Sequence, residues 1–431
     1  MNSFANLGID DSSFVENESA VRAYCRDFPA VLSQGRGSWV YDETGRAYLD
    51  FLAGAGTLNY GHNDPHIKRA VLDYLEDDGI VHALDLYTRA KRAFLDKFRG
   101  VILEPRGLDY RVQFPGPTGT NAVEAALKLA RKVTGRTNVV AFTNAFHGMT
   151  LGSLAATGNA AKRAGAGLAL GHITRMPYDG YLGAGVDTLD YLARALDDPG
   201  SGVDAPAAFL VETIQGEGGL NVASVEWLRR LQAIARAHES LLIVDDIQAG
   251  CGRSGAFFSF ERAALEPDLV CLAKAVGGLG LPLALVLIKP EYDQWLPGEH
   301  NGTFRGNTLA LVAGAAALDY WADTRFAALL RDKSGLLRAR LQALATRYAP
   351  RRSAVRGLGL MQGIWFEDPE MAGQVSQAAF RRGLIAETCG PRAEVLKLLP
   401  PLTTDVPTLR QGLDILEAAL AEVSGPARAC A

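Results

Sequence analysis

The segment "DLVCLAKAVGGLG" (residues 268–280) places one lysine, Lys274, between an apolar run and a glycine-rich stretch. A lysine ammonium in apolar surroundings reaches water along its stem, finds a partner, or loses its proton. A desolvated lysine has a lowered pKa and attacks carbonyl carbons to form an imine. From this segment alone, a nucleophilic lysine and a lysine that reaches the surface at a strand end both stay open.

Two adjacent carboxylates end the segment "LLIVDD" (241–246). Ligands of open α/β sheets bind at the carboxyl ends of the strands, where Asp245 and Asp246 are expected. Side chains alternate along a strand, so only one of the two faces a given crevice, and a buried carboxylate there needs a cationic or N–H partner. A metal ion is the rival ligand. Because no histidine or third acid lies nearby and the seven histidines are dispersed, we expect no metal site.

The segment "FPGPTGTNAVEAALKLARK" (114–132) has the pattern of a strand end, a glycine- and proline-rich loop and the start of a helix. Free N–H groups and the helix dipole bind anions at such a point, and Thr118 and Thr120 add hydroxyl donors. A threonine-rich N-cap also begins many ordinary helices, and the GxxxxGK[ST] pattern is absent. The segment alone does not separate a phosphate site from a plain helix cap.

Two further segments place aromatic or acidic side chains after candidate strands. The segment "AFTNAFHGMT" (141–150) brings Phe146 and His147, and Phe146 offers a flat face to a planar ligand, although an aromatic there is more often part of the core. The segment "FLVETIQGEGG" (209–219) brings Glu212 and Glu217, for which a solvent-exposed loop position is the ordinary alternative.

Together these features match one cofactor, pyridoxal 5′-phosphate (PLP). PLP requires an anion cradle for its phosphate, a carboxylate for its ring nitrogen, a stacking face for its ring and a lysine for its aldehyde. The carboxylate keeps the ring nitrogen protonated, so the ring accepts the electrons released when the Cα–H bond of a substrate breaks. The lysine then carries the proton.

A parallel sheet between helices is expected to position these residues. Short apolar runs alternate with amphipathic stretches, which is typical of βαβ units. Several of the runs are apolar at successive positions, as expected for strands that helices cover on both faces. The candidate strands are 110–114, 138–142, 207–213, 241–246, 269–273 and 283–289, and the clearest helical stretches are 120–135 and 224–239.

The two ends of the chain have a different pattern. Residues 37–54, "GSWVYDETGRAYLDFLAG", predict a hairpin with "DETG" as its turn, and "GLGLMQGIWFE" predicts a late strand. We predict an α/β fold with a large central domain (61–330) and a smaller α+β domain built from an N-terminal segment (1–60) and a C-terminal segment (331–431).

Composition excludes several classes of partner. The 431-residue chain has a net charge of −4 and no basic block, which excludes electrostatic binding to nucleic acid or an anionic membrane. Its longest apolar run is broken by Lys274, glycines and Pro282, against a membrane span. The N-terminus lacks a signal-peptide pattern, and the five cysteines form no CxxC pair, so we expect a cytoplasmic protein with free thiols.

Residues 30–420 resemble the class III (ornithine/ω-amino acid) PLP-dependent aminotransferases of fold type I. The motifs that carry the resemblance occur in family order: "TGTNAVEAALKLAR", "FHG", "ETIQGEGG", "VDDIQAGCGRSG", "AKAVGGLGLP" and "NGTFRGN". The resemblance implies a large domain with a mainly parallel seven-stranded sheet between helices. It also implies a homodimer, or a higher assembly of dimers, with active sites at the subunit interface.

The resemblance also implies roles for single residues. Lys274 and Asp245 take the catalytic positions, as the lysine that forms the imine and the partner of the pyridine nitrogen. Cofactor contacts fall on Thr118, Gly119, Thr120, Phe146, His147, Gln248 and Thr303. Among these, Phe146 stacks on the ring, Gln248 contacts the phenolic oxygen, and Thr303 reaches the phosphate from the other subunit. Glu217 matches a glutamate that helps the enzyme switch between amine and dicarboxylate substrates.

The chain departs from the family pattern at the residues that are expected to bind the substrate. The family arginine that binds the α-carboxylate of glutamate falls on Lys397 of "KLLPPL", which keeps the charge but lacks the bidentate fork. In "TFRGN", Arg305 stands where a small residue is usual. We expect Lys397 and Arg305 to take part in carboxylate recognition. Asp246 replaces the usual glutamate after Asp245, a change that we expect to be mild.

A finer resemblance concerns one subgroup, the L-2,4-diaminobutyrate:2-oxoglutarate aminotransferases. It rests on the segments "FLAGAGTLNYGHNDPHIKRAVLDYLEDDGIVHALDLYTRAKRAFL", "WLPGEHNGTFRGN" and "GLIAETCGP". It implies amino transfer from glutamate to aspartate 4-semialdehyde, giving 2-oxoglutarate and diaminobutyrate, a step of ectoine synthesis. Still open are other ω-aminotransferases acting on ornithine or 4-aminobutyrate, diaminobutyrate supply for a siderophore or antibiotic, a PLP racemase or aminomutase, and a non-catalytic binding protein.

Overall fold

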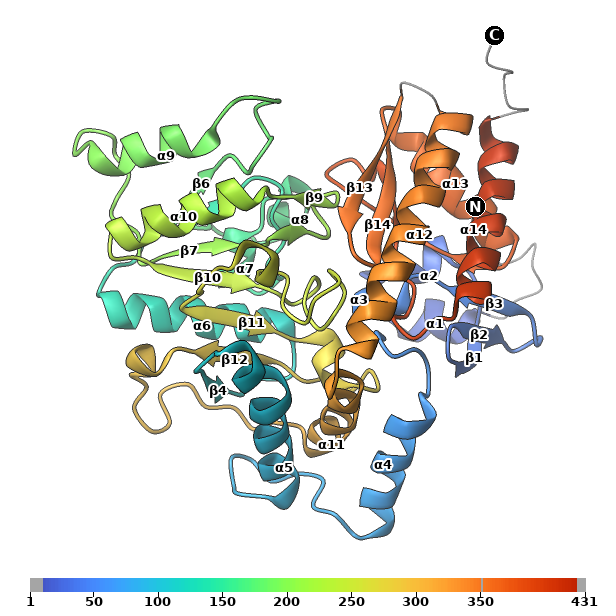
Figure 1. The fold of residues 1–431 in the computed structure, drawn as a ribbon, viewed down its shortest axis with the longest axis horizontal. Helices are drawn as coiled ribbons and strands as arrows, with labels where there is room; N and C mark the ends of the chain where they lie inside the picture. Colours follow the sequence, from blue (N-terminus) through green and yellow to red (C-terminus); the bar gives the residue numbers. More distant parts are fainter. Residues whose placement is uncertain (1–10, 350–351, 425–431) are drawn as a thin grey trace.

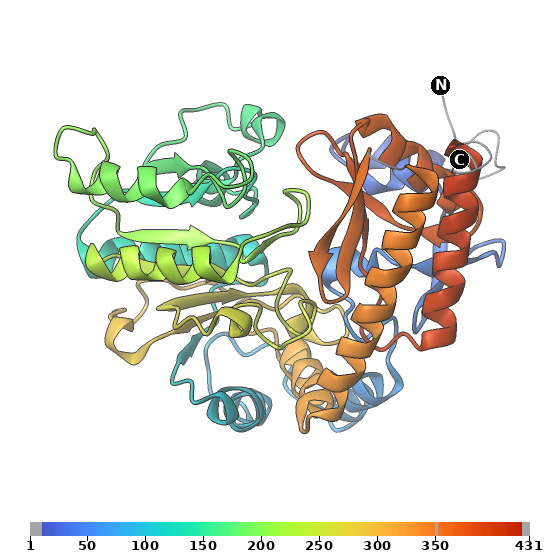
Figure 2. The same cartoon turned by 45° about the horizontal axis from the view of Figure 1, so that its top comes forward.

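The computed structural model describes residues 11–349 and 352–424. Figure 1 shows two lobes side by side, one built from the middle of the chain and one in which the blue N-terminal and the orange to red C-terminal segments come together. Turning the molecule keeps the two lobes apart, with the long helix α12 (Arg325–Tyr348) facing the central lobe (Figure 2).

The central lobe contains a seven-stranded sheet with the order β4-β12-β11-β10-β7-β5-β6. Its strands are β4 (Arg111–Gln113), β5 (Val139–Phe142), β6 (Ile173–Met176), β7 (Ala208–Val211), β10 (Leu241–Asp245), β11 (Leu269–Leu272) and β12 (Leu285–Ile288). Six strands run in the same direction, and β12, which is antiparallel to both of its neighbours, is the exception. The prediction of a mainly parallel sheet is therefore confirmed. β12 reverses because the segment before it contains only a short 3-10 turn, without the crossover helix that a parallel return requires.

Both alternating sets of side chains along these strands are apolar, which explains why helices cover both faces of this sheet. Leu241 and Ile243 of β10 belong to one buried cluster, which also contains the apolar face of α6 (Gly119–Thr134). Leu242 and Val244 belong to another cluster together with α10 (Val225–Ala237). Because alternate side chains point to opposite faces, a strand that is apolar on both parities is buried on both.

The second lobe joins the two ends of the chain. Its first sheet contains β1 (Leu32–Arg36), β2 (Trp39–Asp42), β3 (Ala47–Asp50) and β15 (Leu384–Ile385), and its second contains β13 (Ser353–Leu358), β14 (Met361–Phe366), β17 (Val395–Leu398) and β16 (Glu387–Cys389). The late strand β15 pairs in parallel with β3. The predicted hairpin is confirmed: Asp42 accepts hydrogen bonds from the Thr44 and Arg46 N–H groups in its turn. The domain limits at residues 60 and 330 stay a prediction.

The remaining elements surround these sheets. The helices α13 (Pro369–Arg381) and α14 (Val406–Ser424) pack on each other in the second lobe, and α11 (Thr308–Ala317) packs on α4 (Pro65–Glu76) and α5 (Arg89–Phe98) below the central sheet. The others are α1 (Ser12–Asn17), α2 (Tyr24–Asp27), α3 (Ala53–Gly56), α7 (Leu151–Ala156), α8 (Ala160–Ala164), α9 (Thr188–Asp197), β8 (Ile214–Gln215) and β9 (Asn221–Val222).

Three observations bear on the classes of function considered above. Among the described residues no helix combines the length and the apolar character that a bilayer span requires. The described chain also brings together no group of three or more histidine, cysteine and acidic side chains that could hold a metal ion. The thiols of Cys25, Cys251, Cys271 and Cys389 are free, and Cys430 lies outside the described residues. The cytoplasmic location stays a prediction.

Candidate active site

Four of the sequence motifs meet at one edge of the central sheet. Phe146 and His147 follow β5, the acidic "ETIQGEGG" segment follows β7, the two aspartates end β10, and Lys274 follows β11. These four strands run parallel, so their carboxyl ends lie at the same edge of the sheet. The order of the strands thus brings together residues as far apart in the sequence as Phe146 and Lys274.

Lys274 is only partly exposed, and its side chain has no hydrogen bond or ion pair with the other described residues. It begins a 3-10 turn directly after the buried strand β11, and its φ of 53° lies in the left-handed region, which a lysine adopts only under strain. Burial lowers the pKa of its ammonium, against the opposing effect of the Glu217 carboxylate. A lysine with a lowered pKa holds more of the neutral amine, which is the nucleophilic form.

Asp245 lies beside a buried histidine. Its Oδ2 is 2.7 Å from Nδ1 of His147, and its Oδ1 accepts a hydrogen bond of 3.2 Å from the Ile247 N–H group. The other ring nitrogen of His147, Nε2, is buried without a partner. Asp246 instead accepts the Ser259 N–H group, and burial raises its pKa to about 7. The two aspartates face different partners, as the alternation along the strand predicts.

The N-terminus of α6 provides the anion cradle. Thr118 precedes the helix and donates its hydroxyl to Asn121 at 2.7 Å, while the first N–H groups of the helix have no intrahelical acceptor. The Thr120 hydroxyl lies 2.7 Å from that of Thr150 and 2.6 Å from that of Ser153. A Cβ on Gly119 would stand 3.0 Å from the Ile247 side chain, a contact tight enough that Ile247 would have to shift.

Phe146 lies at the wall of a cavity of about 470 Å³. Its N–H group donates to Glu212 at 2.9 Å, which excludes a solvent-exposed position for that glutamate, and burial raises the pKa of Glu212 to about 7. The Lys162 ammonium lies 5.1 Å from the centre of the Phe146 ring. Lys162 is the only cationic side chain among the described residues that line this cavity, and Glu217 is the only acidic one.

Glu217, Gln248 and Lys397 are in direct contact. Gln248 donates from Nε2 to Glu217 Oε1 at 3.1 Å, and Lys397 Nζ lies 2.7 Å from the same oxygen. Gln248 Oε1 is buried without a partner, and a Cβ on Gly216 would stand 1.7 Å from it. The ammonium of Lys397 lowers the pKa of Glu217 to about 2 despite burial, so this carboxylate is ionised.

Thr303 and Arg305 lie apart from this group within the chain. The Thr303 carbonyl is 3.1 Å from His82 Nε2, and Arg305 is 2.6 Å from Asp85 and donates to the His300 carbonyl. Both residues therefore pair with the segment 82–85 and its surroundings, and their cofactor and carboxylate roles stay predictions.

The sequence as a whole was compared with known protein families. Residues 21–420 match the family described as aminotransferase class-III. The chain belongs to this family. Its members are PLP-dependent, so the protein is a PLP-dependent aminotransferase and the fold-type prediction is confirmed.

Individual relatives of this aminotransferase are similar over nearly their whole length. A diaminobutyrate--2-oxoglutarate transaminase from Nocardia farcinica is 57% identical, with 94% of this chain and 93% of the relative covered. The enzyme of that name from Halalkalibacterium halodurans is 55% identical, with 95% and 96% covered. The solved ornithine aminotransferase from Toxoplasma gondii superimposes with a TM-score of 0.83 at 26% identity, with 98% and 96% covered.

The residues at the sheet edge fit PLP. The buried atoms without partners, Nε2 of His147 and Oε1 of Gln248, supply polar contacts that a ligand can use. Gly119 begins α6, where free backbone N–H groups and the helix dipole favour an anion. The charged Asp245, the aromatic Phe146 and the desolvated Lys274 complete the donor set that this cofactor requires.

The structure adds two residues that sequence reasoning gave no role. Lys162 lies on α8, whose sequence offers no pattern that links it to Phe146. Glu387 lies 2.9 Å from Lys397. It stands in the segment "GLIAETCGP", and its contact depends on a strand register that the sequence does not show.

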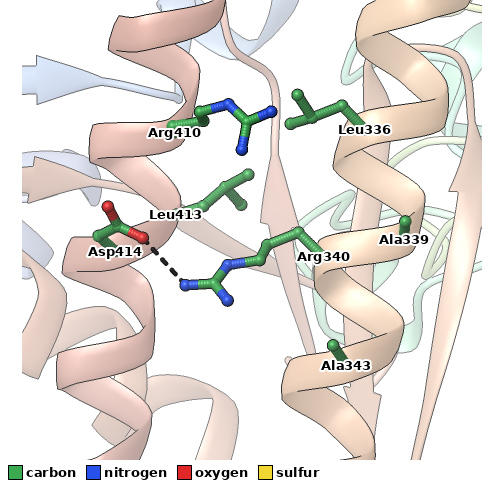
Figure 3. A pocket seen from close by; sticks show the side chains of 7 residues that line it. All are labelled: Leu336, Ala339, Arg340, Ala343, Arg410, Leu413 and Asp414. Carbon is green, nitrogen blue, oxygen red and sulfur yellow. Dashed lines mark hydrogen bonds and ion pairs between the residues drawn. The ribbon is translucent and has the colours of Figure 1, made fainter.

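Another hollow, of about 550 Å³, lies between α12 and α14 in the second lobe (Figure 3). Apolar side chains and an Arg340–Asp414 ion pair of 2.9 Å line it. None of the predicted site residues belongs to it, and its side chains offer no nucleophile. The cavity beside Phe146 and Glu217 is therefore the candidate substrate site.

Proposed function

We propose that this aminotransferase exchanges an amino group between L-glutamate/2-oxoglutarate and aspartate 4-semialdehyde/L-2,4-diaminobutyrate. The observation that carries the proposal is the 55–57% identity, over 94–95% of the chain, to enzymes named diaminobutyrate--2-oxoglutarate transaminase. Supply of diaminobutyrate for ectoine synthesis remains a prediction about the pathway, for which neighbouring genes are the test.

The side chains at the sheet edge support a role for each in this exchange. PLP supplies the aldehyde that takes up the amino group and a ring that accepts electrons. Lys274 holds the cofactor and carries the proton that leaves the reacting carbon of the amino acid. Asp245, fixed by His147, keeps a negative charge beside the position of the ring nitrogen. Thr118, Gly119 and Thr120 bind the phosphate at the start of α6.

The two substrate pairs place different demands on the same cavity. Glutamate has a carboxylate next to its reacting carbon, whereas diaminobutyrate reacts at its terminal carbon, which has none. The closed Glu217–Lys397 pair suits the diamine, because it leaves no free cation beside the reacting carbon. The opened pair suits glutamate, because Lys397 then accepts a carboxylate.

The choice of amino donor tests the proposal. With 2-oxoglutarate as acceptor, we expect the kcat/KM of the holoenzyme for L-2,4-diaminobutyrate to exceed that for ornithine by about tenfold or more, because one extra methylene changes discrimination by about that much. We expect it also to exceed the value for 4-aminobutyrate, which has the same length but lacks the α-amino group. A preference for ornithine or 4-aminobutyrate would assign the chain to another ω-aminotransferase. A purified protein that takes up no PLP would support the binding-protein alternative.

We further propose that the enzyme is a homodimer whose interface contains Thr303. Large apolar side chains gather on the segment 80–87, which contacts Thr303 through His82, and at the position after Thr303. All of them are exposed in the single chain: Ile80, Val81, Leu84, Leu86, Tyr87 and Phe304. Tyr87 is 99% exposed. A contiguous exposed apolar surface of this kind marks an interaction site, and closed twofold dimers are the commonest homo-oligomers.

Sedimentation tests the dimer. The wild-type protein is expected at about twice the chain mass of 46.1 kDa, or a multiple of that. A Leu86→Glu/Tyr87→Glu variant is expected to shift toward the monomer and to lose turnover. Tyr191→Glu, at an exposed tyrosine on α9, is the matched control and should change neither. A wild-type monomer with full turnover would contradict the proposal.

A further inference from the structure

Lys397 is shared by two carboxylates. Its Nζ lies 2.7 Å from Glu217 Oε1 and 2.9 Å from Glu387 Oε1, and the Lys397 side chain is fully buried. The two acids raise the pKa of the lysine well above its ordinary value, so the ammonium stays charged. The charges of all three groups act on the pKa of Lys274, so the cluster lies within electrostatic reach of the reacting amine.

The two acids are held in different ways. Glu387 and Lys397 are cross-strand partners in the antiparallel pair β16–β17, so their contact is fixed by the sheet. The Tyr24 hydroxyl donates to the other Glu387 oxygen at 3.3 Å, and the Glu387 side chain is 4% exposed. Glu217 stands instead between Gly216 and Gly218 in the loop after β8, its side chain is 24% exposed, and it lines the cavity beside Phe146.

This asymmetry has an energetic consequence. Removing the only partner of a buried charge is strongly unfavourable, because the remaining charge is neither hydrated nor paired. If Glu217 were the only acid on Lys397, turning it away to admit a substrate carboxylate would leave a bare buried ammonium during the exchange. With Glu387 in place, Lys397 stays paired and fixed in position while Glu217 turns into the cavity.

We propose that Glu387 is a positioning residue that holds Lys397 in place while Glu217 exchanges with a substrate carboxylate. The inference rests on the proposed function, in which glutamate and 2-oxoglutarate need Lys397 and the diamine does not. Glu217 is then the mobile acid and Glu387 the fixed one. Because Glu387 acts through Lys397, its loss affects the dicarboxylate half-reaction and leaves the diamine half-reaction nearly unchanged.

Separate half-reactions of the PLP-loaded Glu387→Gln variant test this. We expect the apparent dissociation constant for glutamate to rise about tenfold or more, with the value for diaminobutyrate within about threefold of wild type. Glu387→Asp keeps the charge and should restore part of the glutamate affinity. In Glu217→Gln we expect the opposite pattern, with glutamate affinity retained and the apparent dissociation constant for diaminobutyrate raised.

Several outcomes would overturn the inference. Equal losses in both half-reactions of Glu387→Gln would indicate a merely structural role, and unchanged glutamate affinity would show that Lys397 does not need the second acid. A rise of about tenfold or more in the glutamate dissociation constant of Glu217→Gln, relative to wild type, would remove the asymmetry, and this arm decides the case even if Glu387→Gln fails to fold. A wild-type enzyme that does not react with diaminobutyrate would instead contradict the proposed function.

Discussion

Replacing Lys274 with alanine is expected to abolish amino transfer, with turnover falling by about a thousandfold or more. The variant removes both the amine that holds the cofactor and the group that carries the proton. The fold should survive, because Lys274 has no hydrogen bond or ion pair with other described residues and Glu217 keeps its pair with Lys397. Steady-state turnover, together with circular dichroism and the absorbance of lysine-bound PLP, measures both parts of this expectation.

Lys289→Ala is a suitable control for this variant. Lys289 also follows a buried strand of the central sheet, but it pairs with Asp268 at 2.8 Å and lies away from the carboxyl-end cluster. It should keep turnover and the absorbance of the bound cofactor. Near wild-type turnover in Lys274→Ala would show that another group holds the cofactor.

Asp245→Asn is expected to lower kcat by about 10²–10³-fold, the range for removal of one preorganised group that stabilises developing charge. Asparagine keeps the size of the side chain and can still accept the Ile247 N–H group. It loses the negative charge that holds a proton on the ring nitrogen, so the ring becomes a poorer electron acceptor. PLP should still bind through Lys274 and the start of α6, so kcat falls more than cofactor affinity.

The neighbouring acid provides the matched control. Asp246→Asn removes a carboxylate one position away, but Asp246 bonds the Ser259 N–H group rather than His147. An asparagine carbonyl can accept the same bond, so kcat should remain within a few-fold of the wild-type value. Equal losses in the two variants would mean that general damage to the end of β10, rather than the charge of Asp245, explains the effect.

The sequence predicts the strands of the central sheet well where burial alone determines the pattern. The runs 241–246 and 269–273 are apolar on both parities, and they form β10 and β11. β6 was not predicted, because its residues "ITRM" form a short edge strand that is only partly buried and contains Arg175. An edge strand of this kind leaves no hydrophobic run that can be distinguished from a loop.

Some residues of the candidate site could likewise be predicted from the sequence, and others could not. Lys274 and Asp245 could be predicted because each lies at the carboxyl end of a buried strand, and these ends of a parallel sheet lie together. The Glu217–Lys397–Glu387 cluster could not, because it depends on the register of β16 with β17 and on the meeting of the two lobes. Arg305 illustrates the limit: its charge suggests carboxylate binding, while within the chain it pairs with Asp85.

The path of the nitrogen tests the central claim most directly. The holoenzyme would be incubated with 2-oxoglutarate and L-2,4-diaminobutyrate that carries ¹⁵N only on its terminal amine, and both products would be analysed by mass spectrometry. The account predicts that the label appears in glutamate and that the second product is aspartate 4-semialdehyde with its α-nitrogen unlabelled. Unlabelled glutamate, or no glutamate at all, would contradict it.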